Sequence, residues 1–152
     1  MIRRRALLAA STLVPLSGCA GGVPTPPTVV LSITASADVN ADDRGTPLPI
    51  AVRVYTLSSR GRFASADAFG LLDRESAVLG SEGKRVEALI VRPGESRTLT
   101  MILTPDVRYV GVAALYQNID GAQWRSVAPV APSGVTKLVL LLGRRRATLE
   151  VA

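Results

Sequence analysis

The residue types that this chain lacks limit its chemistry as much as those it carries. It has no histidine and a single cysteine, Cys19, among 152 residues. This composition excludes Ser-His-Asp and Cys-His nucleophiles and histidine-based zinc sites. Paired carboxylates could still act as acid and base, but the acidic residues fall mostly in predicted turns, where solvated surface is expected. We therefore expect no catalytic activity, no cofactor and no small-molecule substrate.

The best metal candidate is the segment 38–42, in which Asp38, Asn40 and Asp42 have the D-x-N-x-D spacing of a calcium-binding loop. The match then fails. The sixth position of such a loop is a glycine but is Asp43 here, and the twelfth is a bidentate glutamate but is Pro49 here. We interpret the segment as a polar loop rather than a calcium site.

Cys19 ends an N-terminal segment that has the features of an export signal. Three arginines at positions 3–5 precede an apolar run over 6–16, which is too short to span a bilayer as a helix. The sequence Leu16-Ser17-Gly18-Cys19 resembles the lipobox of bacterial lipoproteins. In proteins with that signal, the cysteine thiol receives a diacylglyceryl group, the chain is cut before the cysteine and the new amino group is acylated. The alternative is an ordinary signal peptide with an incidental cysteine.

Lipidation of Cys19 would decide where the protein works. It would consume the only thiol, which excludes disulfides. Each buried methylene contributes about 0.8 kcal/mol, so two or three acyl chains hold a protein stably on a membrane. Aspartate after the cysteine resembles an inner-membrane retention signal, and the residue here is Ala20. We therefore expect anchoring by the acyl chains to the periplasmic face of the outer membrane of a Gram-negative bacterium.

The charge of the mature chain is modest. The formal charge of +6 includes the three arginines of the signal peptide, so about +3 remains after cleavage. A periplasmic protein of this charge has little reason to bind nucleic acid, and we expect no such partner.

The remaining 134 residues predict one domain behind a short tether. We expect a signal peptide over 1–18, a lipidated cysteine with a Pro/Gly-rich tether over 19–28, and a folded domain over 29–152. The prolines of the tether favour extended, semi-rigid conformations.

Alternating apolar and polar residues predict a mainly β domain. In 29–35 the odd-numbered side chains are apolar, and Ile50, Val52 and Val54 face away from Arg53 and Tyr55 in the next strand. The expected strands are 29–35, 50–57, 86–91, 97–103, 109–116, 124–130, 136–142 and 146–151. Turn residues separate them, among them Pro93-Gly94, Asp120-Gly121 and Gly143. This spacing favours an antiparallel β-sandwich of about eight strands.

Residues 65–80 break the strand pattern and predict a helix or two. Phe69 and Leu72 are three residues apart on an apolar face, Ser65 could cap the start, and Gly80 could end the segment. We expect this insertion to lie across one end or edge of the sandwich, where it would protect an exposed sheet edge.

Two further features have open interpretations. Arg144, Arg145 and Arg146 follow Gly143 between two strands, which favours a solvated hairpin tip over a site for an anionic partner or lipid headgroups. Trp124, the only tryptophan, fits either core packing or a binding hot spot.

Several stretches in this order resemble the TssJ family (SciN, VasD) of type VI secretion lipoproteins. The segment 44–57 is similar to the second-strand region of that family, and Pro93-Gly94-Glu95 to one of its turns. Its helical insertion and its later strands are similar to the following residues: Phe63, Ala66, Asp67, Phe69, Leu72, Asp73, Leu79 and Gly80, then 108–116, Trp124 and Arg125.

The resemblance implies a transthyretin-like β-sandwich with a small helical addition. It also implies binding to the C-terminal periplasmic domain of the inner-membrane protein TssM, which forms an envelope-spanning complex with TssL and the lipoprotein. In this family the contact runs largely through the loop between the first two strands, which here is 36–49. Its polar residues, expected to be exposed, are Asp38, Asn40, Asp42, Asp43, Arg44 and Thr46.

Other functions fit parts of the sequence. A generic periplasmic ligand-binding lipoprotein predicts an apolar cavity with converging polar and aromatic groups, and this chain has few aromatic residues. A pilotin-like lipoprotein would share the lipobox but not the second strand or the helical insertion. Transthyretin-related hydrolases depend on histidines, which are absent here.

Overall fold

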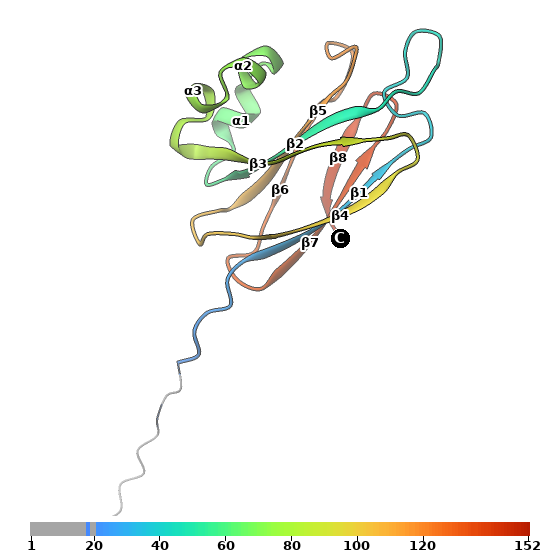
Figure 1. Ribbon diagram of the computed structural model, residues 1–152. Coiled ribbons are helices and arrows are strands. Elements are labelled where there is room, and N and C mark those ends of the chain that lie inside the picture. The colour runs from blue at the N-terminus through green and yellow to red at the C-terminus, as the bar shows by residue number, and fades with distance from the viewer. Residues whose placement is uncertain (1–17, 19–20) are drawn as a thin grey trace, which may run out of the picture.

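The computed structural model describes Gly18 and residues 21–152 (Figure 1). Cys19 and residues 1–17 of the predicted signal peptide lie outside these described residues, so lipidation stays a sequence-based prediction. An extended segment from Gly21 leads into the first strand. Within the part of the chain that is described, none of the helices has both the length and the apolar character needed to cross a membrane.

Eight strands form two four-stranded sheets that pack face to face (Figure 1). The strands are β1 (Thr28–Ala35), β2 (Ile50–Leu57), β3 (Gly83–Val91), β4 (Ser96–Ile102), β5 (Tyr109–Leu115), β6 (Arg125–Pro129), β7 (Val135–Leu142) and β8 (Ala147–Val151). One sheet has the order β4-β1-β7-β8 and the other β3-β2-β5-β6. The predicted β-sandwich is thus confirmed.

One pair of strands departs from the antiparallel arrangement. β1 and β7 are parallel, with Thr28 opposite Val135 and Ala35 opposite Leu142, whereas the other neighbouring strands are antiparallel. A hairpin turn forces two consecutive strands to be antiparallel, but β1 and β7 are far apart in the sequence. Their direction is set by the tertiary fold, and alternation of side chains carries no information on it.

The alternation correctly identifies the core face. Val29, Leu31 and Ile33 of β1 are fully buried, and so are Val52 and Val54 of β2. These side chains fill the space between the two sheets, where full burial of an aliphatic side chain contributes about 1.5–3 kcal/mol.

The helical insertion is longer than expected. It contains α1 (Gly61–Ser65), α2 (Ala68–Asp73), α3 (Glu75–Leu79) and a 3₁₀ turn, η1 (Gly80–Glu82). Ser65 does not cap it, because this residue lies inside α1. The cap of α2 is instead Asp67, whose Oδ1 accepts a hydrogen bond of 2.6 Å from the amide of Gly70. Gly80 ends α3 as predicted, with a φ of 55° that favours glycine.

The insertion packs on part of the outer face of the β3-β2-β5-β6 sheet, over Tyr55, Leu57 and Ala113, and the prediction that it lies across an end or edge is wrong (Figure 1). Tyr55 points away from the central core, as expected, but it is fully buried under the insertion. Its ring centroid lies 5.3 Å from that of Phe63. A Cβ on Gly111 would come within 3.0 Å of the Phe63 ring, so this glycine allows α1 to approach β5 closely. Phe69 lies on the other side of α2 and is 67% exposed.

A polar cluster holds the insertion to the sheet. The hydroxyl of Tyr55 donates to Oε2 of Glu75 at 2.9 Å, and the same oxygen lies 3.3 Å from Nη1 of Arg53. The Nε of Arg85 lies 3.6 Å from the other carboxylate oxygen. Burial, reinforced by Glu75, raises the pKa of Tyr55 to about 12. The predicted polar face of β2 is therefore the contact surface for the helices.

Arg125 joins β6 to the end of α1. Its guanidinium donates to the carbonyls of Phe63 and Ala66 and lies 4.7 Å from the ring centroid of Trp124. Burial lowers the pKa of Arg125. Trp124 is half-buried and packs against both the central core and the core under the helices. Of the two interpretations of Trp124, the structure favours packing.

Candidate partner-binding end of the sandwich

Apart from the helical insertion, the segments between strands fall at two opposite ends of the sandwich. The tether enters β1 at one end, which we call the tether end and which also carries the β4–β5 loop 103–108 and the β6–β7 loop 130–134. The predicted binding loop 36–49 follows β1 and therefore lies at the other end, which we call the loop end (Figure 1). Eight residues of β1 separate the two by about 25 Å at the rise of a strand.

The β1–β2 loop is held by its own hydrogen bonds. Oδ1 of Asp42 accepts from the amides of Arg44 and Thr46, both at 2.9 Å, and the carbonyl of Asp42 accepts from the amide of Gly45. The amide of Asp42 donates to the carbonyl of Thr46 in return. Gly45 has a φ of 81°, a conformation that other residues rarely adopt. The tip of the loop is thus a closed turn built around one aspartate.

Asn40 fastens this loop to the next one along the same end. Its φ of 48° is left-handed and its side chain is buried, unlike the exposed side chain that was expected. The side-chain amide donates to the carbonyl of Pro49 at 3.0 Å, and Oδ1 accepts from the amide of Gln117 at 2.8 Å. Asn40 therefore fixes the base of the loop and does not lie on its exposed surface.

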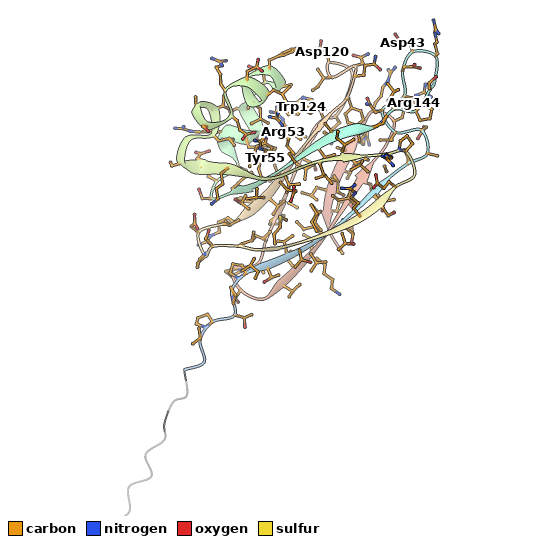
Figure 2. The ribbon with its side chains drawn as sticks, viewed as in Figure 1. Asp43, Arg53, Tyr55, Asp120, Trp124 and Arg144 are labelled. Carbon is orange, nitrogen blue, oxygen red and sulfur yellow. The ribbon has the colours of Figure 1, made fainter. Side chains whose placement is uncertain are left out.

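The remaining predicted residues differ in exposure and in whether their side chains already form hydrogen bonds. Asp38 is exposed, but its carboxylate accepts a 2.7 Å hydrogen bond from the hydroxyl of Ser36. Asp42 is half-buried, and its carboxylate already accepts the backbone hydrogen bonds of the turn. Asp43, Arg44 and Thr46 are exposed at the tip, and Figure 2 shows Asp43 projecting from it. The tip thus presents one anion, one cation and one hydroxyl on an ordered backbone.

Neighbouring segments extend this surface. Gln117 and Asn118 of the β5–β6 loop line a shallow hollow together with residues 41–44. Nη2 of Arg144 lies 3.9 Å from the position that a Cβ of Gly45 would take. The sequence predicts both segments as turns, but it carries no signal that brings them beside 36–49, because that proximity depends on the strand order.

Hydrogen bonds from backbone and side-chain groups stabilise these turns. The amide of Ser36 donates to the carbonyl of Leu142, and the hydroxyl of Tyr116 donates to the carbonyl of Gly143 at 3.0 Å. Burial raises the pKa of Tyr116 above its usual range. In the β3–β4 turn, hydrogen bonds from the Arg92 amide and the Arg97 guanidinium lower the pKa of Glu95. The loop end is therefore a set of mutually supported turns.

The arginine run at the β7–β8 turn lies at the loop end, far from the point where the tether enters (Figure 2). Arg144, Arg145 and Arg146 are all exposed there, as expected of a solvated hairpin tip. This position does not suit contact with lipid headgroups next to the anchor.

The calcium-like spacing has a structural explanation. The side-chain oxygens of Asn40 and Asp42 accept backbone amides, and that of Asp38 accepts a hydroxyl. Among residues 18 and 21–152, no group of three or more His, Cys, Asp or Glu side chains is placed to hold a metal ion.

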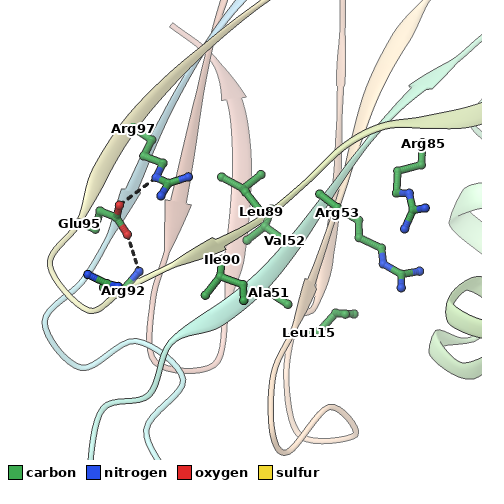
Figure 3. A pocket seen from close by; sticks show the side chains of 11 residues that line it. Ala51, Val52, Arg53, Arg85, Leu89, Ile90, Arg92, Glu95, Arg97 and Leu115 are labelled. Atoms are coloured by element: carbon green, nitrogen blue, oxygen red, sulfur yellow. Dashed lines mark hydrogen bonds and ion pairs between the residues drawn. The ribbon is translucent and has the colours of Figure 1, made fainter.

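A second hollow lies on the outer face of the β3-β2-β5 strands (Figure 3). Its floor includes Ala51, Ile90 and Leu115, and arginines flank it, but the carboxylate of Glu95 already accepts hydrogen bonds from Arg97 and from the Arg92 amide. No aromatic side chain lines it, and it is an open groove. It does not have the form expected of a small-ligand cavity.

The chain is similar in sequence and structure to known proteins. Residues 27–145 match the model of a family described as type VI secretion lipoprotein (VasD, EvfM, TssJ). The chain is 30% identical to the crystal structure of the T6SS lipoprotein TssJ1 from Pseudomonas aeruginosa, over 84% of this chain and 97% of that one, with a TM-score of 0.78. It is 29% identical to Serratia marcescens Lip, a membrane-bound component of the type VI secretion system, with the same coverage and a TM-score of 0.74.

A third similar chain belongs to a structure described as the T6SS protein TssM C-terminal domain from EAEC. It is 25% identical over 83% of this chain and 98% of that one, with a TM-score of 0.60. A search of curated proteins found no match. The matched family model covers most of the folded domain, and the similar structures share its two sheets and short helices, so the chain belongs to the TssJ family of type VI secretion lipoproteins.

Proposed function

We propose that this protein tethers a type VI secretion membrane complex to the outer membrane. The acyl chains on Cys19 anchor it to the periplasmic face of that membrane, and the β1–β2 loop binds the C-terminal periplasmic domain of TssM, which assembles with TssL. This role needs no catalysis, no cofactor and no small-molecule substrate.

The observation that carries the proposal is the position of the two attachments. The tether leaves one end of the sandwich and loop 36–49 projects from the other. A partner that arrives from the inner membrane therefore meets the loop end first. Similarity to a chain in a structure described as the TssM C-terminal domain supports TssM as that partner.

The order of the loop suits binding. Asn40 and Asp42 fix its backbone before a partner arrives, so little conformational entropy is lost on docking. The exposed tip residues Asp43, Arg44 and Thr46 are then free to contact TssM. Lipid anchoring holds the loop near the membrane and raises its effective concentration.

Isothermal calorimetry tests the contact. We expect the domain from Gly21 onward to bind the C-terminal periplasmic domain of TssM, and we expect the combined changes Asp43→Ala, Arg44→Ala and Thr46→Ala to weaken binding at least about tenfold, or roughly 1.4 kcal/mol. Asp106→Ala is the matched control, because Asp106 is an exposed aspartate in a loop at the tether end.

Two results would contradict the proposal. Absence of binding by the well-folded wild-type domain would refute TssM as the partner. Equal affinity of the wild type and the triple variant would place the interface elsewhere on the domain.

A further inference from the structure

Exposed apolar side chains gather at the tether end, on and beside the outer face of the β4-β1-β7-β8 sheet. Ile102 is 77% exposed and Val135 is 60% exposed. Both pair with Thr28, the first residue of β1, so they flank it on the same face of the sheet. Val151, at the end of the edge strand β8, is 54% exposed and lines a shallow hollow with Val135 and Pro129. It lies opposite the buried Leu138, so it borders the other two side chains from the core-facing side of the sheet, beyond the packed core. We call Ile102, Val135 and Val151 the apolar rim.

The outer sheet face beside the rim carries few charged side chains. Lys137 is the one charged residue that lines the hollow. The outward side chains of β1, β4 and β7 alternate with the buried ones, and among them Lys137 is the one charged residue; the others are Ser, Thr, Val, Ile and Leu. On the same face, β8 adds the exposed Glu150, which lies opposite Val139. Exposed apolar side chains that cluster in this way commonly mark a contact surface.

The tether leaves the domain beside this rim. The amide of Thr28 donates to the carbonyl of Gly134 at 2.8 Å, and the amide of Leu103 donates to the carbonyl of Pro27 at 2.8 Å. Gly134 and Leu103 are the immediate neighbours of the rim residues Val135 and Ile102. The base of the tether is therefore fixed between the two.

The reach of the tether limits what the rim can meet. Cys19 precedes Thr28 by nine residues, which span at most about 30 Å when fully extended. A lipid on Cys19 would thus keep the tether end close to the bilayer. The membrane is therefore a surface within reach of the rim.

We propose that the apolar rim docks on the lipid surface to which the chain is anchored, an inference that rests on the proposed lipidation of Cys19. Ile102, Val135 and Val151 enter the boundary between headgroups and acyl chains, where burial of apolar surface is favourable. Lys137, two residues after Val135 on the same face, reaches the lipid phosphates with its ammonium group. The anchor supplies the local concentration that makes such a small contact effective. Docking would direct the loop end away from the membrane.

The chain offers a direct test, because acylation occupies Cys19 and an introduced cysteine becomes the only free thiol. Ile102→Cys and Val135→Cys place a thiol on the rim. Leu141→Cys is the matched control, since Leu141 is 50% exposed on the same face of β7 but at the loop end. Each acylated variant is labelled with an NBD fluorophore and reconstituted in vesicles of phosphatidylethanolamine and phosphatidylglycerol.

For the two rim labels, we expect blue-shifted emission and quenching by doxyl-labelled lipid at least about twofold stronger than for the label at 141, because docked apolar groups lie some 5–10 Å into the interface. Water-like emission at all three positions, in protein that floats with the vesicles, would overturn the docking and leave the anchor intact. Blue-shifted emission at all three without lipid quenching would indicate protein–protein contact and would also overturn it. Protein that fails to float would show that the chain is not lipid-anchored, which would also overturn the docking.

Discussion

At the scale of single residues, Asn40 fastens the β1–β2 loop to the neighbouring β5–β6 loop. Its amide group bridges the carbonyl of Pro49 and the amide of Gln117 while its own backbone is left-handed. We predict that Asn40→Ala destabilises the domain by about 2 kcal/mol, because it leaves two partly buried backbone groups without partners and places alanine at a positive φ. Urea denaturation measures this change.

Asp43→Ala is the control for that prediction. Asp43 is exposed at the tip of the same loop, so its removal should change the free energy of unfolding by no more than about 0.5 kcal/mol. Equal stability losses for the two variants would mean that Asn40 does not fasten the loop.

The family resemblance points to loop 36–49, but the sequence does not predict the structural role of each polar residue in that loop. Asp38, Asn40 and Asp42 have the spacing of metal ligands, and the same composition suits a turn stabilised by side-chain hydrogen bonds. Which of these occurs depends on where the backbone amides of Arg44, Thr46 and Gln117 lie. Gln117 comes from a distant segment, so no local pattern could separate the buried Asn40 from the exposed Asp43.

At the scale of secondary-structure elements, the helical insertion is attached to β2 through Tyr55 and Glu75. The pKa of Tyr55 is raised to about 12, so the folded state holds the phenolic proton more tightly than the unfolded state, in which the ordinary value is near 10. The contribution of this group to stability is therefore complete below pH 10 and is lost as the pH rises toward 12.

We predict that the wild type loses about 2 kcal/mol of stability between pH 8 and pH 11.5 through Tyr55, and that Tyr55→Phe lacks this part of the loss. At pH 8 the variant should be less stable by about 1 kcal/mol, because its hydrogen bond to Glu75 is gone. Urea denaturation of both proteins at the two pH values gives the comparison. The same pH dependence in both would contradict the assignment to Tyr55, since Tyr116 is present in each.

The strands were predictable because alternation follows from local geometry. The predicted and observed bounds of β2 coincide, and the buried positions of β1 are those expected. The face covered by the helices was not predictable, because Tyr55 and Arg53 have the polarity of an outer face until Phe63, Leu71 and Glu75 pack over them. The parallel β1–β7 pair was missed for a similar reason, since it depends on the whole chain path.

At the scale of the whole molecule, the proposed function makes the sandwich a rigid spacer between two attachments. β1 runs from the tether to the binding loop, and it is hydrogen-bonded on both sides, to β4 and to β7. Pulling on the two ends would therefore load a strand in the interior of a sheet, which is harder to detach than an edge strand. Lipid docking by the apolar rim would add orientation to this connection.

Vesicle flotation tests the central claim most directly, because it requires both attachments at once. Acylated protein is reconstituted in vesicles, the soluble C-terminal periplasmic domain of TssM is added, and the fraction of TssM that floats is measured. We expect TssM to float with the wild type. A smaller fraction of TssM should float with the Asp43→Ala, Arg44→Ala, Thr46→Ala variant, which itself floats. TssM should stay at the bottom with Cys19→Ser, which binds TssM but is not anchored. Flotation of TssM with either variant to the same extent as with the wild type would contradict the account.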